Sequence, residues 1–336
     1  MLLDATVMHP YSLNLFEYRH ERNISDDEVL EALLAIESYL FRRWVCKVPT
    51  NALNKVFETL HGEVLRGVAE GGAYSNVLRR VLLSKEGSGR FPNDSEFMDT
   101  FGLRDFYHIG SYKYYLFDRL ENGDSVERVN VVGNLHEEFF SIEHIMPQTL
   151  STGWIAGLGE KYAEIHEKWL NSMANLTLTA YNSKYSNRRF VEKRDMQDGF
   201  KVSGFRINNF VSSQNAWTKE QLEARDREMR EKFLNLWPMI DSTFEWNNDA
   251  YEERALDDDF DFTGRKIAAY SFMGSRFTAK TWADMICGVL SMIYEMEPVV
   301  LRKFIPADAG FPGRFFFPRR GWSLFQDWGW CLLQPW

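Results

Sequence analysis

The apolar residues in the first third of the chain recur at helical spacing. Ser25 comes directly before three acidic residues, which is typical of a helix N-terminus, and leucine, valine and isoleucine residues follow it three or four positions apart. The same spacing predicts further helices at residues 52–68, 74–83, 95–101 and 112–120. We therefore expect a mainly α chain with an N-terminal extension over residues 1–24 and a helical domain over residues 25–125.

Two short apolar segments interrupt the helical pattern between residues 126 and 240. Residues 139–145 and 176–180 are predicted to be strands, and Pro147 ends the first of them because proline cannot donate a hydrogen bond to a sheet. Helices are expected around these strands at 162–170, from near Ser183, and at 218–236. Strand, strand and helix in this order predict a small ββα unit, so we expect residues 126–240 to form a separate domain.

The rest of the chain differs in charge and aromatic content. Residues 241–262 contain nine acidic residues against one arginine, so we expect an acidic linker. Residues 263–305 should then form a small α+β domain from a hairpin and an amphipathic helix. Residues 306–336 contain nine aromatic residues without a regular period. We expect an irregular aromatic tail there, either a packed cap or a sequence altered by truncation or a frameshift.

Composition is that of an ordinary soluble globular protein. Hydrophobic residues make up 45% of the sequence and charged residues 26%. No apolar stretch approaches the roughly 20 residues that cross a bilayer, and the N-terminus lacks a signal-peptide pattern. The three cysteines are odd in number and far apart. We therefore expect a cytoplasmic protein without a membrane partner.

The charge of the chain is unevenly placed. A net charge of −9 argues against a protein that coats nucleic acid indiscriminately. Residues 184–206, however, contain seven lysines and arginines against three acidic residues. A nuclease needs basic surface only near its site, so this distribution permits nucleic-acid binding.

The residues best suited to catalysis lie near the ends of the two predicted strands. Glu143 and His144 are adjacent in the first strand, and Asn182 comes just before the helix that follows the second. Hydrolysis of a phosphodiester needs a base to activate water and a hard divalent ion with oxygen ligands. His144 offers an imidazole for the first task, and Glu143 and Asn182 offer oxygen atoms for the second.

The geometry of a strand restricts this arrangement. Adjacent residues on a regular strand point to opposite faces, so Glu143 and His144 face one metal ion only if the strand ends or twists there. Asn175 begins the second strand and is expected to hold the His144 ring through its side chain or backbone. Asn182 would lie at the positive end of the next helix, where an anionic phosphate binds well. The substrate backbone would then be approached by Lys184, Arg188 and Lys193.

Three runs of the sequence together resemble a known family. They are Ile142-Glu143-His144-Ile145-Met146-Pro147-Gln148, then Asn175-Leu176-Thr177-Leu178, then Asn182 to Lys193 with Asn187 and Phe190 between them. These runs resemble the HNH (His-Me finger) nuclease domain at the C-terminal end of GmrSD-type, modification-dependent (type IV) restriction endonucleases. The similarity covers roughly residues 25–240.

The resemblance implies a ββα-metal nuclease core that uses Mg²⁺ or Mn²⁺ to cleave DNA, modified or unmodified. Residue by residue, it makes His144 the general base and Asn175 the residue that orients it. Glu143 and Asn182 become the metal ligands. Substrate binding is expected from Lys184, Asn187, Arg188 and Lys193.

One part of the family pattern is missing. Its members usually carry or partner an N-terminal domain with a D-G-Q-Q-R-like motif that is associated with nucleotide binding. This chain contains neither that motif nor a G-x-x-x-x-G-K-[ST] loop. We therefore expect no nucleotide site in the chain and a separate nucleotide-binding restriction subunit as its partner.

The sequence as a whole predicts a metal-dependent HNH endonuclease that hydrolyses DNA, the nuclease component of a type IV-like anti-phage restriction system. Two alternatives stay open. The chain is a catalytically inactive DNA-binding or assembly subunit, or it is a nuclease directed at RNA.

Overall fold

The computed structural model describes residues 6–123, 125–246, 254–257 and 261–297. The chain divides into two compact units, Met1–Trp246 and Asn247–Trp336. The aromatic tail expected at residues 306–336 lies outside the described residues. No helix among the described residues is both long enough and apolar enough to cross a membrane.

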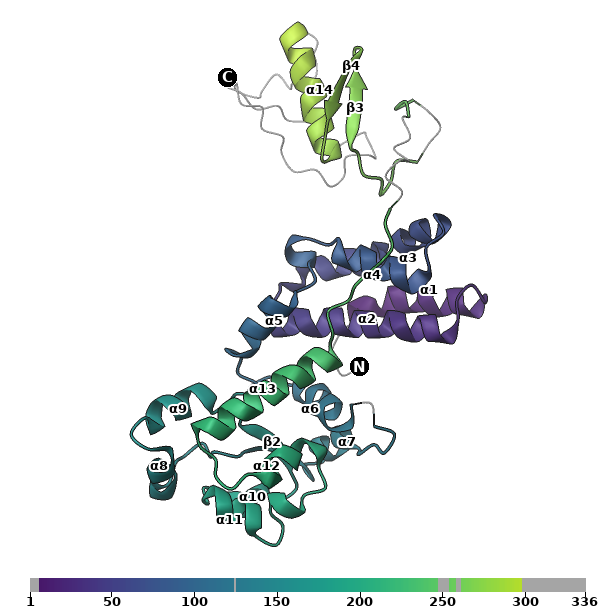
Figure 1. Ribbon diagram of the computed structural model, residues 1–336. Coiled ribbons are helices and arrows are strands. Elements are labelled where there is room, and N and C mark those ends of the chain that lie inside the picture. The colour runs from purple at the N-terminus through teal and green to yellow at the C-terminus, as the bar shows by residue number, and fades with distance from the viewer. Residues whose placement is uncertain (1–5, 124, 247–253, 258–260, 298–336) are drawn as a thin grey trace. The chain divides into compact units, whose positions relative to one another are not determined.

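The first unit is built mainly from helices (Figure 1). Its longer helices are α1 (His9–His20), α2 (Asp26–Val45), α3 (Leu53–Ala69), α4 (Tyr74–Leu83), α5 (Asp94–Phe101), α6 (Tyr112–Asn122), α9 (Tyr162–Trp169) and α13 (Lys219–Leu236). Its shorter ones are α7 (Val131–His136), α8 (Thr152–Leu158), α10 (Asn182–Tyr185), α11 (Phe190–Asp195) and α12 (Asn209–Ser213). The helices predicted from apolar spacing are confirmed, except that the one expected from near Ser183 is divided into α10 and α11. Helices α1, α7, α8 and α12 were not predicted.

The start of α2 is fixed as its sequence predicts. The Ser25 hydroxyl accepts a hydrogen bond from the Glu28 backbone N–H at 3.2 Å, and the Glu28 carboxylate accepts one from the Ser25 N–H at 3.3 Å. These two bonds satisfy backbone donors that the first turn of a helix otherwise leaves open.

The first of three apolar cores lies among α1, α2, α3 and α4. Tyr11 and Leu15 of α1 are completely buried there, beside Phe57 and Leu60 of α3. The segment expected to be an N-terminal extension therefore contributes a helix to this core. Residues 241–246, expected to begin the acidic linker, also pack here, because Phe244 is 9% exposed within the same cluster.

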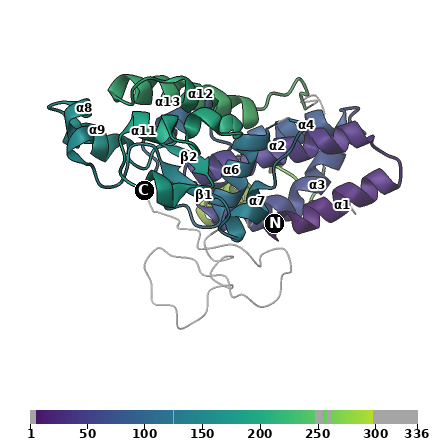
Figure 2. The ribbon, with the colours of Figure 1, turned by 90° about the horizontal axis from the view of Figure 1, so that it is seen from below.

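The other two cores are joined by α13. Its residue Phe233 packs in a core with α2, α5 and α6, where the rings of Phe41 and Trp237 stack with centroids 3.7 Å apart. At its other end, Leu222 packs with residues of α8, α9 and α11. Figures 1 and 2 show α13 lying along the half of the first unit that contains the two predicted strands. This long charged helix thus holds together the two halves of the region that surrounds the predicted strands.

The two predicted strands are shorter than expected but pair with one another. Strand β1 (Ser141–His144) runs antiparallel to β2 (Leu176–Thr179), with Ser141 opposite Thr179 and His144 opposite Leu176. The helix expected from Ser183 is not continuous. Ser186 adopts a left-handed backbone conformation with φ of 45°, which ends α10 after one turn. A second short helix, α11, follows, so the region after β2 is two short helices and not one.

The second unit contains the hairpin and helix that its sequence predicts. Strands β3 (Ala269–Phe272) and β4 (Ser275–Thr278) are antiparallel. Met273 and Gly274 between them both have positive φ, 51° and 79°, as a tight hairpin turn requires. Helix α14 (Trp282–Met296) begins at a capping box formed by Thr281 and Asp284.

Candidate active site

His144 is the last residue of β1, and its side chain is 6% exposed. Its Nε2 atom lies 3.1 Å from Oδ1 of Asn171, a residue between α9 and β2. The ring also packs against Tyr107, with ring centroids 4.3 Å apart. The imidazole is therefore held by one hydrogen bond and one aromatic contact.

The hydrogen bonds beyond Asn171 determine which nitrogen of His144 carries its proton. Nδ2 of Asn171 donates to Oδ2 of Asp105 at 2.8 Å. A carboxylate accepts hydrogen bonds only, so this contact fixes the amide with its oxygen toward His144. The oxygen needs a donor in return, which places the hydrogen on Nε2 and leaves the lone pair on Nδ1.

Asp105 anchors this chain of hydrogen bonds. Its Oδ1 accepts the backbone N–H groups of Tyr107 and His108, each at 2.9 Å, and its Oδ2 lies 2.9 Å from Nδ1 of His108. Partial burial opposes ionisation of Asp105, but the hydrogen bonds from His108, Tyr107 and Asn171 prevail and lower its pKa. Asp105, the last acceptor in this series of hydrogen bonds, is thus a carboxylate at neutral pH.

Burial sets the protonation state of His144. Loss of solvent around the ring lowers the pKa of His144 below its ordinary value, since a buried cation is disfavoured. The hydrogen bond with Asn171 opposes this shift, and the charges of Lys193 and His108 add to it. The imidazole is therefore neutral at pH 7, as a general base must be.

Glu143 points to a different partner. Its Oε1 lies 2.6 Å from Nζ of Lys193, and the two residues are 4% and 0% exposed. The same ammonium donates to the backbone oxygens of His144 at 3.0 Å and Ile145 at 3.2 Å. Burial raises the pKa of Glu143 and lowers that of Lys193, and each charge opposes the shift of the other. The pair therefore ties α11 to the end of β1.

Lys193 lies apart from the other residues that were predicted to bind substrate. Lys193 was expected among the substrate-binding residues, but a completely buried ammonium with three oxygen partners does not reach a phosphate in solvent. Its position shows that it neutralises Glu143 and holds the backbone oxygens of His144 and Ile145.

The expected metal ligands do not fit a divalent ion as they stand. The Glu143 carboxylate is bound by an ammonium, whereas Asn182 is exposed at the start of α10. The described residues contain no group of three or more histidine, cysteine, aspartate or glutamate side chains able to hold a metal ion. Mg²⁺ and Mn²⁺ usually bind several oxygen ligands at once, and the side chains in this arrangement do not provide them.

Asn175 holds the backbone after His144 and not the ring. Its Oδ1 accepts the N–H of Met146 at 2.8 Å, and its Nδ2 donates to the oxygens of Met146 at 2.9 Å and Leu170 at 3.0 Å. Its own backbone oxygen accepts the N–H of Ile145 at 2.9 Å. The expected orientation of His144 by Asn175 is therefore indirect, and the atom that forms a hydrogen bond with the ring belongs to Asn171.

The remaining predicted residues lie together on an exposed segment after β2. Lys184 is bound to Asp198 at 2.6 Å, and Nε of Arg188 donates to the backbone oxygen of Lys184 at 3.0 Å. These predicted residues are all exposed: Asn182, Lys184, Asn187 and Arg188. They form a polar and basic surface on α10 and the turn after it, whereas Glu143 and Lys193 are buried.

Sequence reasoning missed Asp105, Tyr107, His108 and Asn171. The first three lie in a loop between α5 and α6, far from the strands in sequence. One local signal was present, because an aspartate that accepts the backbone N–H groups two and three residues later forms a recognisable turn. Nothing in the sequence alone indicates that this turn packs against His144.

Comparison with known families gives a match in this region. Residues 91–232 match the family model for GmrSD restriction endonucleases, C-terminal domain. The region of His144 resembles a restriction endonuclease domain. The match covers both strands, the loop that carries Asp105, and most of α13. The chain has no match among curated proteins.

Proposed function

We propose that this chain is an HNH endonuclease that hydrolyses DNA phosphodiester bonds, with His144 as general base. It would serve as the nuclease component of a type IV-like restriction system, alongside a separate nucleotide-binding subunit. The observation that carries the proposal is a neutral, oriented histidine at the end of β1, inside the segment that matches a restriction endonuclease domain.

In this proposal the proton is taken up by Nδ1 of His144. Nε2 donates to Asn171, whereas Nδ1 has no hydrogen-bond partner among the described residues. His144 is 6% exposed, so the residue is not completely closed off from solvent. A water held there would lose a proton to Nδ1 as its oxygen attacks phosphorus, and the bond from phosphorus to the leaving sugar oxygen would break. That oxygen would take up a proton from solvent, and the Asn171 oxygen would stabilise the imidazolium that forms.

Contact with the phosphate backbone fits the exposed segment after β2. Lys184 and Arg188 lie there, and both side chains are exposed. The net charge of −9 would otherwise repel a polyanion, so local cations must provide the attraction. This argument supports nucleic acid as the substrate class, and the choice of DNA rests on the family match.

Metal dependence rests on the resemblance alone, because the Glu143 carboxylate is bound by Lys193 and Asn182 is exposed. A divalent ion, if bound, would supply charge neutralisation at the phosphate. The test is a titration of Mg²⁺ against cleavage rate for the parent chain, Glu143→Gln and Asn182→Ala. A higher half-saturating Mg²⁺ concentration in both variants would support Glu143 and Asn182 as metal ligands. Identical titration curves for all three proteins would show that these two residues do not bind the ion.

The primary experiment is plasmid nicking by the full chain, with His144→Ala alongside. The parent should nick and the variant should lose at least about a hundredfold in rate, which is the low end of a general base's contribution. Parallel arms contain unmodified DNA, DNA with glucosylated hydroxymethylcytosine, and RNA. Equal cleavage by both proteins would refute His144 as the base. Binding of DNA without cleavage would favour the alternative that the chain is an inactive subunit. Faster cleavage of RNA than of DNA would favour the alternative that it is a nuclease directed at RNA.

A further inference from the structure

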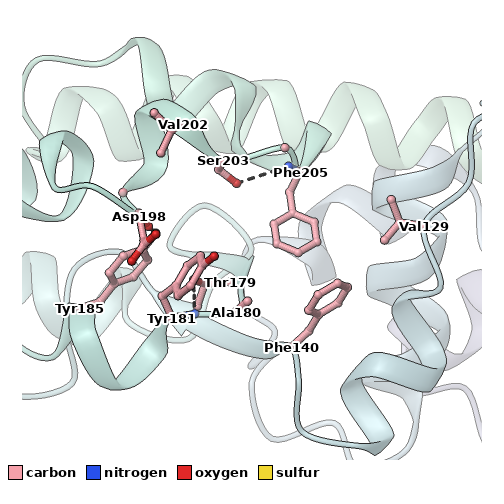
Figure 3. Close-up of a pocket in the computed structure, with 12 residues that line it drawn as sticks. Val129, Phe140, Thr179, Ala180, Tyr181, Tyr185, Asp198, Val202, Ser203 and Phe205 are labelled. Carbon is pink, nitrogen blue, oxygen red and sulfur yellow. Dashed lines mark hydrogen bonds between the residues drawn. The ribbon is translucent and has the colours of Figure 1, made fainter.

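A pocket of about 410 Å³ lies at the Thr179 end of the paired strands β1 and β2, the end opposite His144 (Figure 3). Phe140 and Phe205 meet at one end of it, with ring centroids 4.8 Å apart and planes at 89°. Tyr181 and Tyr185 lie toward the other end. Its volume is near the lower limit of the roughly 300–1,000 Å³ typical of small-molecule sites. The pocket is thus the right size for one planar ring system with an attached sugar.

The polar atoms at this pocket offer one acceptor and one donor. Asp198 binds Lys184 through Oδ2, which leaves its Oδ1 able to accept. The Ser203 oxygen accepts from the Phe205 N–H at 3.3 Å and from Nδ2 of Asn208 at 2.8 Å. Its own hydrogen has no acceptor among the described residues, so it is available to donate. An exposed base edge carries amino and carbonyl groups that match such a pair.

Tyr181 is the ring best placed for stacking. It is 40% exposed, and the Lys184 ammonium lies 4.9 Å from its ring centroid. The ammonium lies over one face of the ring, so a base would stack on the opposite face, with its own phosphate within reach of Lys184. Aromatic stacking together with a nearby cation is how many proteins hold single-stranded nucleic acid.

The pocket also lies at a suitable distance from the proposed base. Thr179 lines it, and Thr179 is paired with Ser141, three residues before His144 on β1. Three residues along a strand span about 10 Å. That distance corresponds to roughly three nucleotides along one stacked strand, at about 3.4 Å each.

We propose that this pocket binds one unpaired nucleobase of the substrate strand, stacked on Tyr181 and hydrogen-bonded to Asp198 and Ser203. This rests on the proposed function, since it assumes a nucleic-acid substrate. In a duplex the base must leave the stack to enter, whereas a single strand offers it directly. The pocket therefore selects substrate positions that are unpaired or easily opened.

The test is binding of the full chain to a fluorescein-labelled single-stranded DNA, measured by anisotropy in EDTA so that cleavage does not interfere. The matched probes are identical except that a second set carries one abasic sugar, moved position by position along the strand. The parent should bind the intact strand about tenfold more tightly than the strand with the critical abasic position, within the range expected for one stacked base.

The variants identify the pocket. Tyr181→Ala should remove the preference for the intact strand, and Tyr181→Phe, which keeps the ring, should retain it. Tyr162→Ala is the matched control, because Tyr162 is 37% exposed on α9 and does not line the pocket. Equal affinity of the parent for every probe, or equal weakening of intact and abasic strands by Tyr181→Ala, would overturn the proposal. Neither result would change nicking that depends on His144. The nuclease proposal and the pocket proposal are therefore tested by different measurements.

Discussion

Oδ1 of Asn171 lies 3.1 Å from Nε2 of His144, and the amide that provides it is fixed by Asp105 at 2.8 Å. This relationship selects one tautomer of the imidazole and leaves Nδ1 as the basic nitrogen. Asn171 does not touch the reacting atoms in the proposed mechanism. It is a positioning residue whose effect should be visible in the acid–base behaviour of His144.

Asn171→Ala should lower the cleavage rate about tenfold or more while changing KM little, because it removes orientation and not a substrate contact. The hydrogen bond from His144 to Asn171 raises the pKa of His144. Its loss should therefore move the acid limb of the pH–rate profile to lower pH. A slower variant with an unmoved acid limb would show that Asn171 supports the fold only.

The pH dependence of the parent chain follows from the burial of His144. A general base works when deprotonated, and burial lowers the pKa of His144 below its ordinary value of 6.5. The cleavage rate should be independent of pH near neutrality and should fall only below pH 6.5. Single-turnover rates in a constant ionic-strength buffer series measure this. A half-maximal rate above pH 7 would contradict a neutral, buried imidazole.

The sequence predicted the elements of the site better than its contacts. The two strands, α9, α13 and the order of candidate residues were predictable because apolar spacing and capping act locally. The partners of Glu143 and His144 were not predictable. Lys193 follows Glu143 by 50 residues and Asp105 precedes Asn171 by 66, so only the fold brings each pair together. The side chain of Lys193 points inward because a buried carboxylate requires a counter-charge.

The packing of α1 in the first core was also not predicted, because it too depends on residues that are distant in sequence. The residues of α1 lack a strong apolar periodicity, and only Tyr11 and Leu15 of this helix are buried. Two buried residues in twelve are too few to predict an amphipathic helix from spacing alone. The helix is recognised only once its partners on α3 are known.

Because Glu143 and Lys193 form a buried ion pair, substitutions of these two residues should have strongly non-additive effects on the free energy of unfolding. Removal of one partner leaves the other charged and buried, which costs about 3–5 kcal/mol in the free energy of unfolding. Lys193→Met and Glu143→Gln should each be destabilising in urea denaturation. The double variant should lose much less than the sum of the two, since it leaves no isolated charge. Additive losses would mean that the two side chains do not interact energetically.

The same pair predicts a pH effect in Lys193→Met. Without the ammonium, burial alone acts on Glu143 and holds its pKa above the unfolded value. A carboxyl with a raised folded pKa contributes stability when protonated, so the loss should be largest at neutral pH and should shrink as the pH falls. Urea denaturation of Lys193→Met and the parent from pH 7 to pH 5 measures the difference. A constant or growing difference toward acid would contradict a buried, unpaired carboxylate.

The first helix offers a matched pair of substitutions. Leu15 is completely buried and Leu13 is 71% exposed, although both lie on α1 and have the same helix propensity. Leu15→Ala should lower the free energy of unfolding by about 2–5 kcal/mol, because it removes buried methyl groups and leaves a cavity. Leu13→Ala should change it by less than about 0.5 kcal/mol. Urea denaturation of both variants decides whether α1 belongs to the folded core. Equal, small effects would show that residues 9–20 behave as the free extension expected from sequence.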